Sequence, residues 1–402
     1  MANITNITSM KKALDFNNTE IAFADKSYRE LRWSNLLYTL MNRPALVRWG
    51  SRLANWALRM KLPVEGLVKR TIYRQFCGGE TIDEARPVIQ KLGQSGIKTI
   101  LDYGVEGKES EADFERTAHY LAQTLEFARE DKDIHIISTK LSGLFRFNLL
   151  MKVSSGTTLT EAERAEFSRG VARVSRICRA AAESGIGVHI DAEHSWIQTA
   201  IDELAWEMSR LYNQENPVVI NAVQLYRKDR LKFLHDSLEH ARKYGYLCAV
   251  KLVRGAYMEK ERARAEELGY PSPIHDTLEE THRAYNEGLE FCLSHLGEMY
   301  VCNATHNEES CRLQAEIMEA KGLAPGHPLV ATAQLYGMSD NLSFNMAYAG
   351  FNVEKYLPYG PVREVVPYLI RRTQENTSVG GQMSRELKLI RKELKRRSSQ
   401  KG

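Results

Sequence analysis

Short β-rich segments alternate with longer amphipathic segments along most of this 402-residue chain, and this alternation limits the fold more than any other feature. The expected strands are the runs at residues 97–103, 134–140, 187–191, 218–224, 247–253, 299–304, 329–335 and 351–357. Neighbouring parallel strands need a crossover of a dozen or more residues, which is usually a helix. Eight such strands with helices between them, spread over about 280 residues, predict an α/β chain folded as a (β/α)8 TIM-type barrel.

Two further observations bear on the barrel prediction. A doubly wound open sheet would show the same alternation, but its dinucleotide site uses a GxGxxG turn, and none follows residues 97–103. Helical patterns at residues 161–184 and 229–244 end at Gly185 and Gly245, and glycine is the usual residue just after a helix. The closed barrel is therefore the favoured arrangement.

Composition and charge exclude several classes of protein. With 43% hydrophobic and 26% charged residues, the chain has the balance of an ordinary globular protein. Its 55 Lys and Arg against 51 Asp and Glu leave a net charge of +4, too small a bias to indicate a nucleic-acid partner. No apolar run approaches the roughly 18 to 20 residues that span a membrane. Six cysteines without a CxxC pair predict reduced thiols in a cytosolic compartment.

The N-terminal region has an unusual charge pattern. Its first 30 residues lack an apolar core and reach their first arginine at Arg29, which argues against a secretory signal or a mitochondrial transit peptide. Residues 31–64 have no acidic side chain and alternate cations with tryptophan and leucine, as amphipathic helices broken near Pro44 would. Such helices either pack over the main domain or lie on an anionic membrane surface.

The chain is expected to divide into three parts. A helical N-terminal arm at residues 1–95 precedes the catalytic barrel at 96–380, and a basic C-terminal tail follows at 381–402. The tail is either solvated or in electrostatic contact with a membrane.

Tyr368, Arg371, Arg372 and Glu375 recur at three and four residues, which places them on one face of a predicted helix. Two adjacent arginines form a forked pair suited to a planar anion such as a substrate carboxylate. The alternative is a solvated helix face with an ion pair between Arg371 and Glu375.

Polar side chains also lie at the C-terminal ends of most of the predicted strands. A (β/α)8 barrel carries its working residues at the C-terminal ends of its strands. The polar residues at those ends are Lys140, Asp191 with Glu193, Gln224, Lys251 with Arg254, Thr305 with His306, and Tyr356. We expect them to converge on one rim of the barrel.

Several of these segments resemble motifs of the FAD-dependent proline dehydrogenases. The stretch EKYLPYGPVREVVPYLIRRTQENTS, residues 354–378, resembles the C-terminal signature of that family. VKLVRGAYMEKER (250–262), VHIDAEH (188–194), NAVQLY (221–226), NATHN (303–307) and STKLSGL (138–144) match further family motifs in the family's order. The resemblance covers nearly the whole predicted barrel.

The resemblance implies a monofunctional enzyme that oxidises L-proline to Δ1-pyrroline-5-carboxylate by hydride transfer to FAD. It further implies that the electrons pass to a quinone and that a separate pyrroline-5-carboxylate dehydrogenase takes the product. It places the protein in the cytoplasm, peripheral on the inner face of a bacterial membrane. The alternatives are a flavin-dependent hydroxyproline or other cyclic-amine dehydrogenase, and a membrane-surface protein with an inactive barrel.

The resemblance also implies which residues hold the cofactor. Lys251 would favour the negative charge that develops on the flavin, and Gln224 would meet its pyrimidine edge. Arg254 would neutralise the pyrophosphate where Gly255 lets the backbone approach closely. The full set implied is Ala192, Gln224, Lys251, Val253, Arg254, Gly255, Ala256, Thr305 and His306. Taken alone, RGAY is a common strand-to-loop turn.

For the substrate, the resemblance implies that Lys140 joins Arg371 and Arg372 around the carboxylate. The remaining implied contacts are Leu335 and Tyr356, as an apolar wall, with Tyr368 and Glu375. A Schiff-base lysine, typical of aldolase barrels, is the rival role for Lys140.

Asp191 and Lys251 are the implied catalytic pair. Asp191 belongs either to the polar network beside the flavin or to a structural ion pair with a barrel lysine. His189 and His194 form an HxDxxH pattern, but their places across a strand end argue against a metal site.

Overall fold

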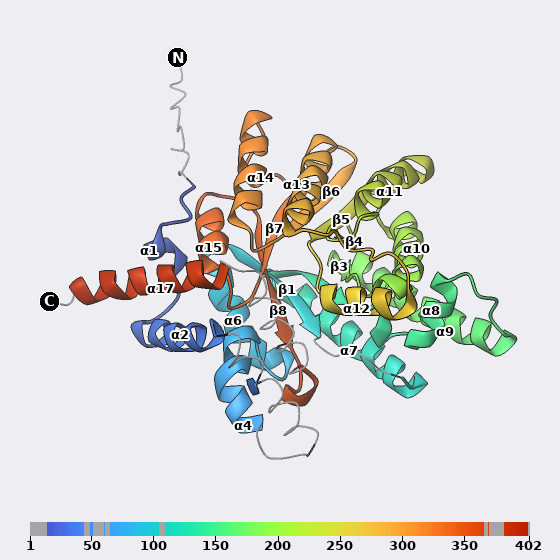
Figure 1. Cartoon of the computed structure of the whole chain (residues 1–402), viewed down its shortest axis with the longest axis horizontal. Coiled ribbons are helices and arrows are strands. Elements are labelled where there is room, and N and C mark those ends of the chain that lie inside the picture. Colours follow the sequence, from blue (N-terminus) through green and yellow to red (C-terminus); the bar gives the residue numbers. More distant parts are fainter. Residues whose placement is uncertain are drawn as a thin grey trace.

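Eight parallel strands close into a barrel in sequence order in the computed structural model (Figure 1). The structure describes residues 14–43, 49–50, 60, 65–103, 109–365, 369 and 382–400. The strands are β1 (Ile97–Tyr103), β2 (Ile134–Thr139), β3 (Gly187–Ile190), β4 (Val219–Gln224), β5 (Cys248–Val253), β6 (Met299–Ala304), β7 (Val330–Leu335) and β8 (Val353–Tyr359). Each predicted strand is present within two residues of its expected bounds, so the (β/α)8 prediction is confirmed.

The closure of the barrel is the pairing of the first strand with the last. β1 and β8 run in parallel register from Ile97 beside Val353 to Tyr103 beside Tyr359. Strand residues are buried on both faces, by the barrel interior and by the surrounding helices, and β4 is buried along its whole length. Such strands read as continuous apolar runs, which is why they could be found in the sequence.

The helices before and between the strands form the outer layer (Figure 1). They are α6 (Ile82–Gly93), α7 (Glu111–Glu130), η2 (Leu141–Gly143), α8 (Phe147–Ser154), α9 (Glu161–Ser184), α10 (Ser195–Tyr212), α11 (Arg230–Tyr244), α12 (Met258–Leu268), α13 (Leu278–Ser294), α14 (Glu308–Ala320) and α15 (Asp340–Tyr348). Gly185 and Gly245 end α9 and α11 with φ of 68° and 69°, a left-handed conformation that glycine adopts without a steric penalty. Both predicted helix ends are confirmed.

The N-terminal region contributes short helices and one longer helix. They are α1 (Thr19–Ala22), α2 (Tyr28–Met41), α4 (Glu65–Val68), the π-helix η1 (Lys69–Tyr73) and α5 (Arg74–Phe76). α2 corresponds to the first part of the predicted basic helical arm. Most of the arm after Pro44 lies outside the described residues. Within the described residues, we find no helix with the length and apolar character needed to traverse a bilayer.

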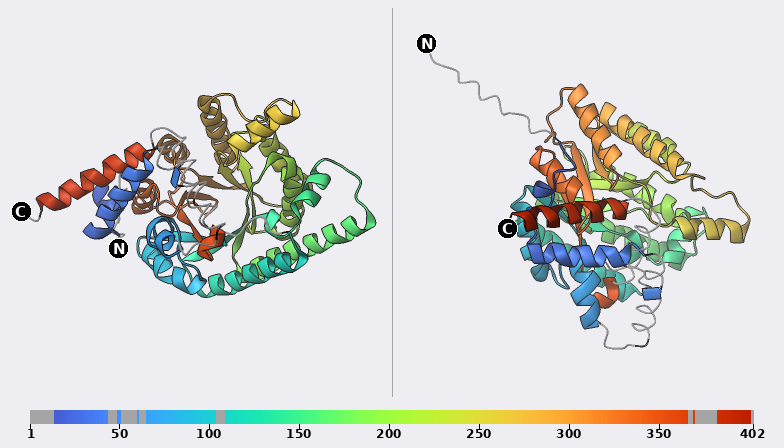
Figure 2. Two further views of the ribbon diagram at one scale, coloured as in Figure 1. Left: turned by 60° about the horizontal axis from the view of Figure 1, so that its bottom comes forward. Right: turned by 60° about the vertical axis from the view of Figure 1, so that its left-hand side comes forward.

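The basic C-terminal segment forms one helix, α17 (Gln382–Ser399), which lies beside α2 and α1 (Figure 2). Its apolar residues Leu387 and Ile390 are buried. Arg397 donates to the backbone oxygens of Lys26 at 2.6 Å and Phe23 at 2.8 Å. The sequence suggested that the tail is either solvated or in contact with a membrane. The buried apolar face of α17 is in neither environment, because it packs on the N-terminal helices.

Candidate active site

A cavity opens at the C-terminal ends of the strands, with about 1270 Å³ of empty space when the open mouth is included. Its lining contains these residues singled out from the sequence: Lys140, Asp191, Ala192, Gln224, Lys251, Val253, Arg254, Gly255, Ala256, Thr305, His306, Leu335 and Tyr356. They come from seven of the strands, β2 to β8, and the loops that follow them. Tyr368, Arg371, Arg372 and Glu375 lie outside the described residues.

Asp191 is the centre of a buried hydrogen-bond network. Its Oδ1 accepts from Lys251 Nζ and, at 3.0 Å, from Ser138 Oγ. Its Oδ2 accepts from Tyr356 OH at 2.8 Å and from Lys140 Nζ at 3.2 Å. The carboxylate therefore joins side chains from β2, β5 and β8 on the floor of the cavity.

The charge balance at Asp191 keeps it ionised. Burial opposes ionisation, but the two ammonium groups of Lys251 and Lys140 outweigh it and hold the pKa of Asp191 well below its usual range. One carboxylate thus faces two cations, and the group of three carries a net positive charge. Such a group favours an anion in the adjoining cavity.

Arg254 forms a second cluster beside the cavity. Its guanidinium donates to His282 Nδ1 at 2.9 Å, Thr305 Oγ1 at 2.6 Å and Ser310 Oγ at 3.0 Å, and it lies 4.1 Å from the ring centre of Tyr285. Burial lowers the pKa of Arg254, but a guanidinium keeps its proton in proteins. Among the described residues no carboxylate pairs with it, so it is a cation held by neutral groups and suited to a phosphate or similar anion.

Two local features of the cavity lining are an acceptor without a partner and a position that only glycine can occupy. Gln224 Oε1, at the end of β4, is buried and has no hydrogen-bond partner within the described chain. Gly255 has φ +138°, and a Cβ there would lie 2.4 Å from the Tyr226 ring. An unpartnered buried acceptor implies a missing donor, and only glycine fits the backbone at position 255.

Residues at the C-terminal ends of β6 and β7 form hydrogen bonds with each other and with residues at the starts of the outer helices. His306 Nδ1 is 2.8 Å from Ser339 Oγ, and the backbone N–H of Leu335 donates to His306 Nε2 at 3.4 Å. Thr305 Oγ1 accepts from both Arg254 and the backbone N–H of Asn307. This wall of the cavity is therefore positioned by hydrogen bonds as well as by the strands.

Sequence reasoning missed some contributors to these clusters. Ser138 donates to Asp191, and its position on β2 gave a signal that could have found it, because it lies two residues before Lys140, which directly follows the strand. His282 lies on α13, and no local motif connects it with Arg254. Glu193, at a predicted strand end, instead accepts from the backbone and hydroxyl of Ser142 and holds η2 in place.

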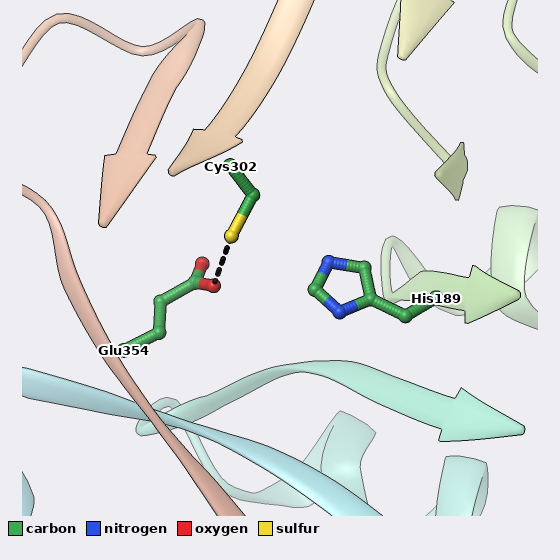
Figure 3. A group of neighbouring side chains, drawn as sticks. All are labelled: His189, Cys302 and Glu354. Atoms are coloured by element: carbon green, nitrogen blue, oxygen red, sulfur yellow. Dashed lines mark hydrogen bonds between the residues drawn. The ribbon is translucent and has the colours of Figure 1, made fainter. Parts of the chain in front are cut away.

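The two histidines of the HxDxxH pattern do not converge. His194 stacks on Trp196 with ring centres 4.4 Å apart. His189 points into the barrel, where its ring lies near the side chains of Cys302 and Glu354 (Figure 3).

Comparisons with known proteins agree on a family. The family model described as "Proline dehydrogenase" matches residues 85–385. The chain is 33% identical over 396 residues to proline dehydrogenase 1, mitochondrial, of Arabidopsis thaliana, covering 86% of this chain and 79% of the relative. It is 32% identical over 422 residues to a hydroxyproline dehydrogenase of Xenopus laevis, covering 96% and 90%.

A solved structure of proline utilization A from Bdellovibrio bacteriovorus, inactivated by N-propargylglycine, shares the fold. It matches with a TM-score of 0.71 and 20% identity over 92% of this chain. The present chain spans 40% of that longer protein.

Proposed function

The chain belongs to the proline dehydrogenase family, and from this premise we propose that it oxidises L-proline to Δ1-pyrroline-5-carboxylate with FAD as its cofactor. The observation that carries the proposal is the charged floor of the cavity. There Asp191 is bound by Lys251, Lys140 and Tyr356, which lie on different strands. A small zwitterion with a carboxylate suits such a floor once a flat cofactor covers part of it.

The residues present fit FAD. Gln224 Oε1 is a buried acceptor without a partner in the described chain, as the N–H of a flavin pyrimidine ring requires. Arg254 is a cation without a carboxylate partner there, and Gly255, which packs against the Tyr226 ring, would let the adjoining backbone approach a pyrophosphate. Thr305 and His306 extend the same wall. Held there, FAD would supply the acceptor for the hydride that leaves C5 of proline, and the ring nitrogen of proline would give up a proton.

Lys251 and Asp191 would then have distinct roles. The Lys251 ammonium, at the end of β5, stabilises negative charge that develops next to it during hydride transfer. Asp191 fixes the position of that ammonium and of Lys140, because it accepts from both. This division makes Lys251 a catalytic residue and Asp191 a positioning residue.

For the substrate, we propose that Lys140, Arg371 and Arg372 bind the carboxylate, with Tyr368 and Glu375 on the same predicted helical face. Leu335 and Tyr356 line the cavity and would contact the carbon ring. Because Asp191 already engages Lys140, the arginines would supply most of the unpaired positive charge.

We also propose that the electrons pass to a membrane quinone and that the protein lies on the inner face of a bacterial membrane. α2 supports this, because Trp33, Leu36 and Leu40 are exposed at spacings of three and four residues. The neighbouring α17 adds exposed cations, among them Arg391 and Lys392. The cyclic imine product can be oxidised further, and a separate pyrroline-5-carboxylate dehydrogenase is the class of enzyme that does so.

The proposal is tested by the spectrum of the purified protein. It should carry bound flavin whose absorbance bleaches when proline is added without oxygen. Protein that binds no flavin, or flavin that stays oxidised with proline, contradicts the proposal.

A variant tests the carboxylate assignment separately. Arg371→Met should raise KM for proline more than tenfold while leaving bound flavin in place. Arg363→Met is the matched control, because Arg363 is half-exposed and pairs with Glu65 away from the cavity. Loss of flavin from Arg371→Met would contradict the assignment.

Hydroxyproline is the second candidate substrate, since a hydroxyproline dehydrogenase aligns with 96% of this chain. Tyr356 favours plain proline, because its hydroxyl is engaged by Asp191 and its ring faces the cavity. Comparing kcat/KM for the two amino acids decides between them.

A further inference from the structure

Three polar side chains meet inside the barrel directly beneath the cavity. His189, Cys302 and Glu354 each precede a cavity-lining residue by two positions, namely Asp191, Ala304 and Tyr356. Because side chains two apart on a strand point to the same face, the three form the next layer down. Figure 3 shows them pointing toward one another from β3, β6 and β8.

We propose that His189, Cys302 and Glu354 bind one divalent transition-metal ion of the zinc class. Their ligand atoms lie within 4.8 Å of one another, and the side chains are 0%, 0% and 1% exposed. Neither ring nitrogen of His189 has a hydrogen-bond partner within the described chain. A fully buried imidazole with both nitrogens unsatisfied is unfavourable, and a metal ligand bond removes that penalty.

The ligand types select the ion. An imidazole, a thiolate and a carboxylate together suit a borderline-soft ion such as Zn²⁺ and do not suit Mg²⁺ or Ca²⁺. Cys302 Sγ lies 3.8 Å from Glu354 Oε2. Zinc–sulfur and zinc–oxygen bonds of about 2.3 and 2.0 Å at a tetrahedral angle place those atoms about 3.5 Å apart. Cys302 and Glu354 therefore need only a small adjustment, whereas the separations of up to 4.8 Å within the group require a side-chain movement of about 1 Å to bring all three atoms onto one ion.

The charges of the occupied site would cancel. Thiolate and carboxylate together carry two negative charges, which balance a divalent ion beside a neutral imidazole. Burial, with Lys251 above, holds the pKa of His189 well below its usual range, and burial raises that of the Cys302 thiol. The imidazole is thus ready to bind, and metal binding must displace the thiol proton.

The lower end of the barrel brings a second histidine next to Glu354. His135, on β2, has its Nε2 2.8 Å from Glu354 Oε1, and its side chain is 43% exposed. His135 therefore lies next to the carboxylate of Glu354 at the solvent-facing end of the barrel. With three protein ligands, the fourth position would hold water. The ion would tie β3, β6 and β8 together without touching flavin or substrate.

Metal content and thermal stability test the proposal on the intact protein. After chelator treatment and dialysis against Zn²⁺, the wild type should retain one zinc per chain and gain several degrees in Tm. Cys302→Ser should bind zinc at least tenfold more weakly and lose the gain in Tm. Cys292→Ser is the matched control, because Cys292 is equally buried but lies on α13.

A second measurement identifies the ligands directly. Cobalt-loaded wild type should show one sulfur neighbour by X-ray absorption, and Cys292→Ser should show the same. Wild type that retains no zinc overturns the proposal even if Cys302→Ser fails to fold. Zinc retained equally by wild type and folded Cys302→Ser, or cobalt without a sulfur neighbour, also overturns it.

Discussion

Glu386 on α17 accepts the backbone N–H of Ser339 with both carboxylate oxygens, at 2.9 and 3.0 Å. Ser339 has φ 51° and is the one non-glycine residue with positive φ in the described chain. That conformation is unfavourable for serine, so the carboxylate helps to hold it. Through the hydroxyl of Ser339, the C-terminal helix reaches His306 on the cavity wall.

Glu386 should make stability depend on pH. Burial, with Asp340 nearby, raises the pKa of Glu386 to about 7 from 4.5. Between those values the folded protein binds a proton that the unfolded chain releases, so the contribution to stability is lost as pH rises from 4.5 to 7. Its full size is on the order of 3 kcal/mol.

Glu386→Gln removes this titration and keeps one acceptor for Ser339. The difference in free energy of unfolding between variant and wild type should therefore grow in the variant's favour from pH 4.5 to pH 8, as measured by urea unfolding. Asp340, Lys26 and Lys355, whose charges act on Glu386, are present in both proteins. A difference independent of pH would show that Glu386 does not titrate in this range.

Asp191→Asn should destabilise the protein strongly. The substitution leaves the buried Lys251 and Lys140 without their carboxylate. Breaking one side of a buried ion pair costs about 3–5 kcal/mol. Tyr356→Phe is the control, because it removes an uncharged donor and leaves all three charges in place; its hydrogen bond to the same carboxylate is worth about 1.5–3 kcal/mol. Equal losses in urea unfolding of the two variants would contradict the role of the charges.

Gly255→Ala should lower flavin binding at least tenfold. The added Cβ would lie 2.4 Å from the Tyr226 ring in a backbone conformation that alanine rarely adopts. Gly297→Ala is the control, because a Cβ there meets nothing within 4 Å. The readout is flavin absorbance per protein chain, and full flavin content in Gly255→Ala would show that flavin binding does not depend on the backbone conformation at Gly255.

Arg254→Met should weaken flavin binding while leaving KM for proline unchanged in the fully loaded enzyme. A charge-assisted hydrogen bond contributes about 1.5–3 kcal/mol, which is roughly a tenfold to hundredfold change in affinity. Arg262→Met is the control, because Arg262 lies on the exposed face of α12 and donates to the backbone of His275. Flavin titration and steady-state kinetics together check this, and a KM effect without loss of affinity would contradict it.

The barrel could be predicted because the sequence patterns of its strands and helix ends depend only on residues close together in the chain. Strands such as Val219–Gln224 are buried on both faces, so they read as apolar runs whatever their partners are. Gly185 and Gly245 mark helix ends by their own backbone preference. The cavity residues could be predicted for a related reason, since parallel strands in a closed barrel bring all their C-terminal ends to one rim.

Contacts between distant segments could not be predicted in this way. His282 reaches Arg254 from another helix, and Glu386 reaches Ser339 from the end of the chain. Nothing in the local pattern around either residue identifies its partner, because such a pair is set by how whole elements pack.

The sequence by itself determined the order of strands and helices and the polar rim, because strand period, helix caps and strand ends depend on near neighbours. Only the tertiary structure decided that Asp191 is shared by two lysines, that α17 packs on the N-terminal helices, and that His189, Cys302 and Glu354 meet in the core. The physical reason is that closing the barrel fixes the stagger of its strands, and that stagger determines which inward side chains lie in the same layer.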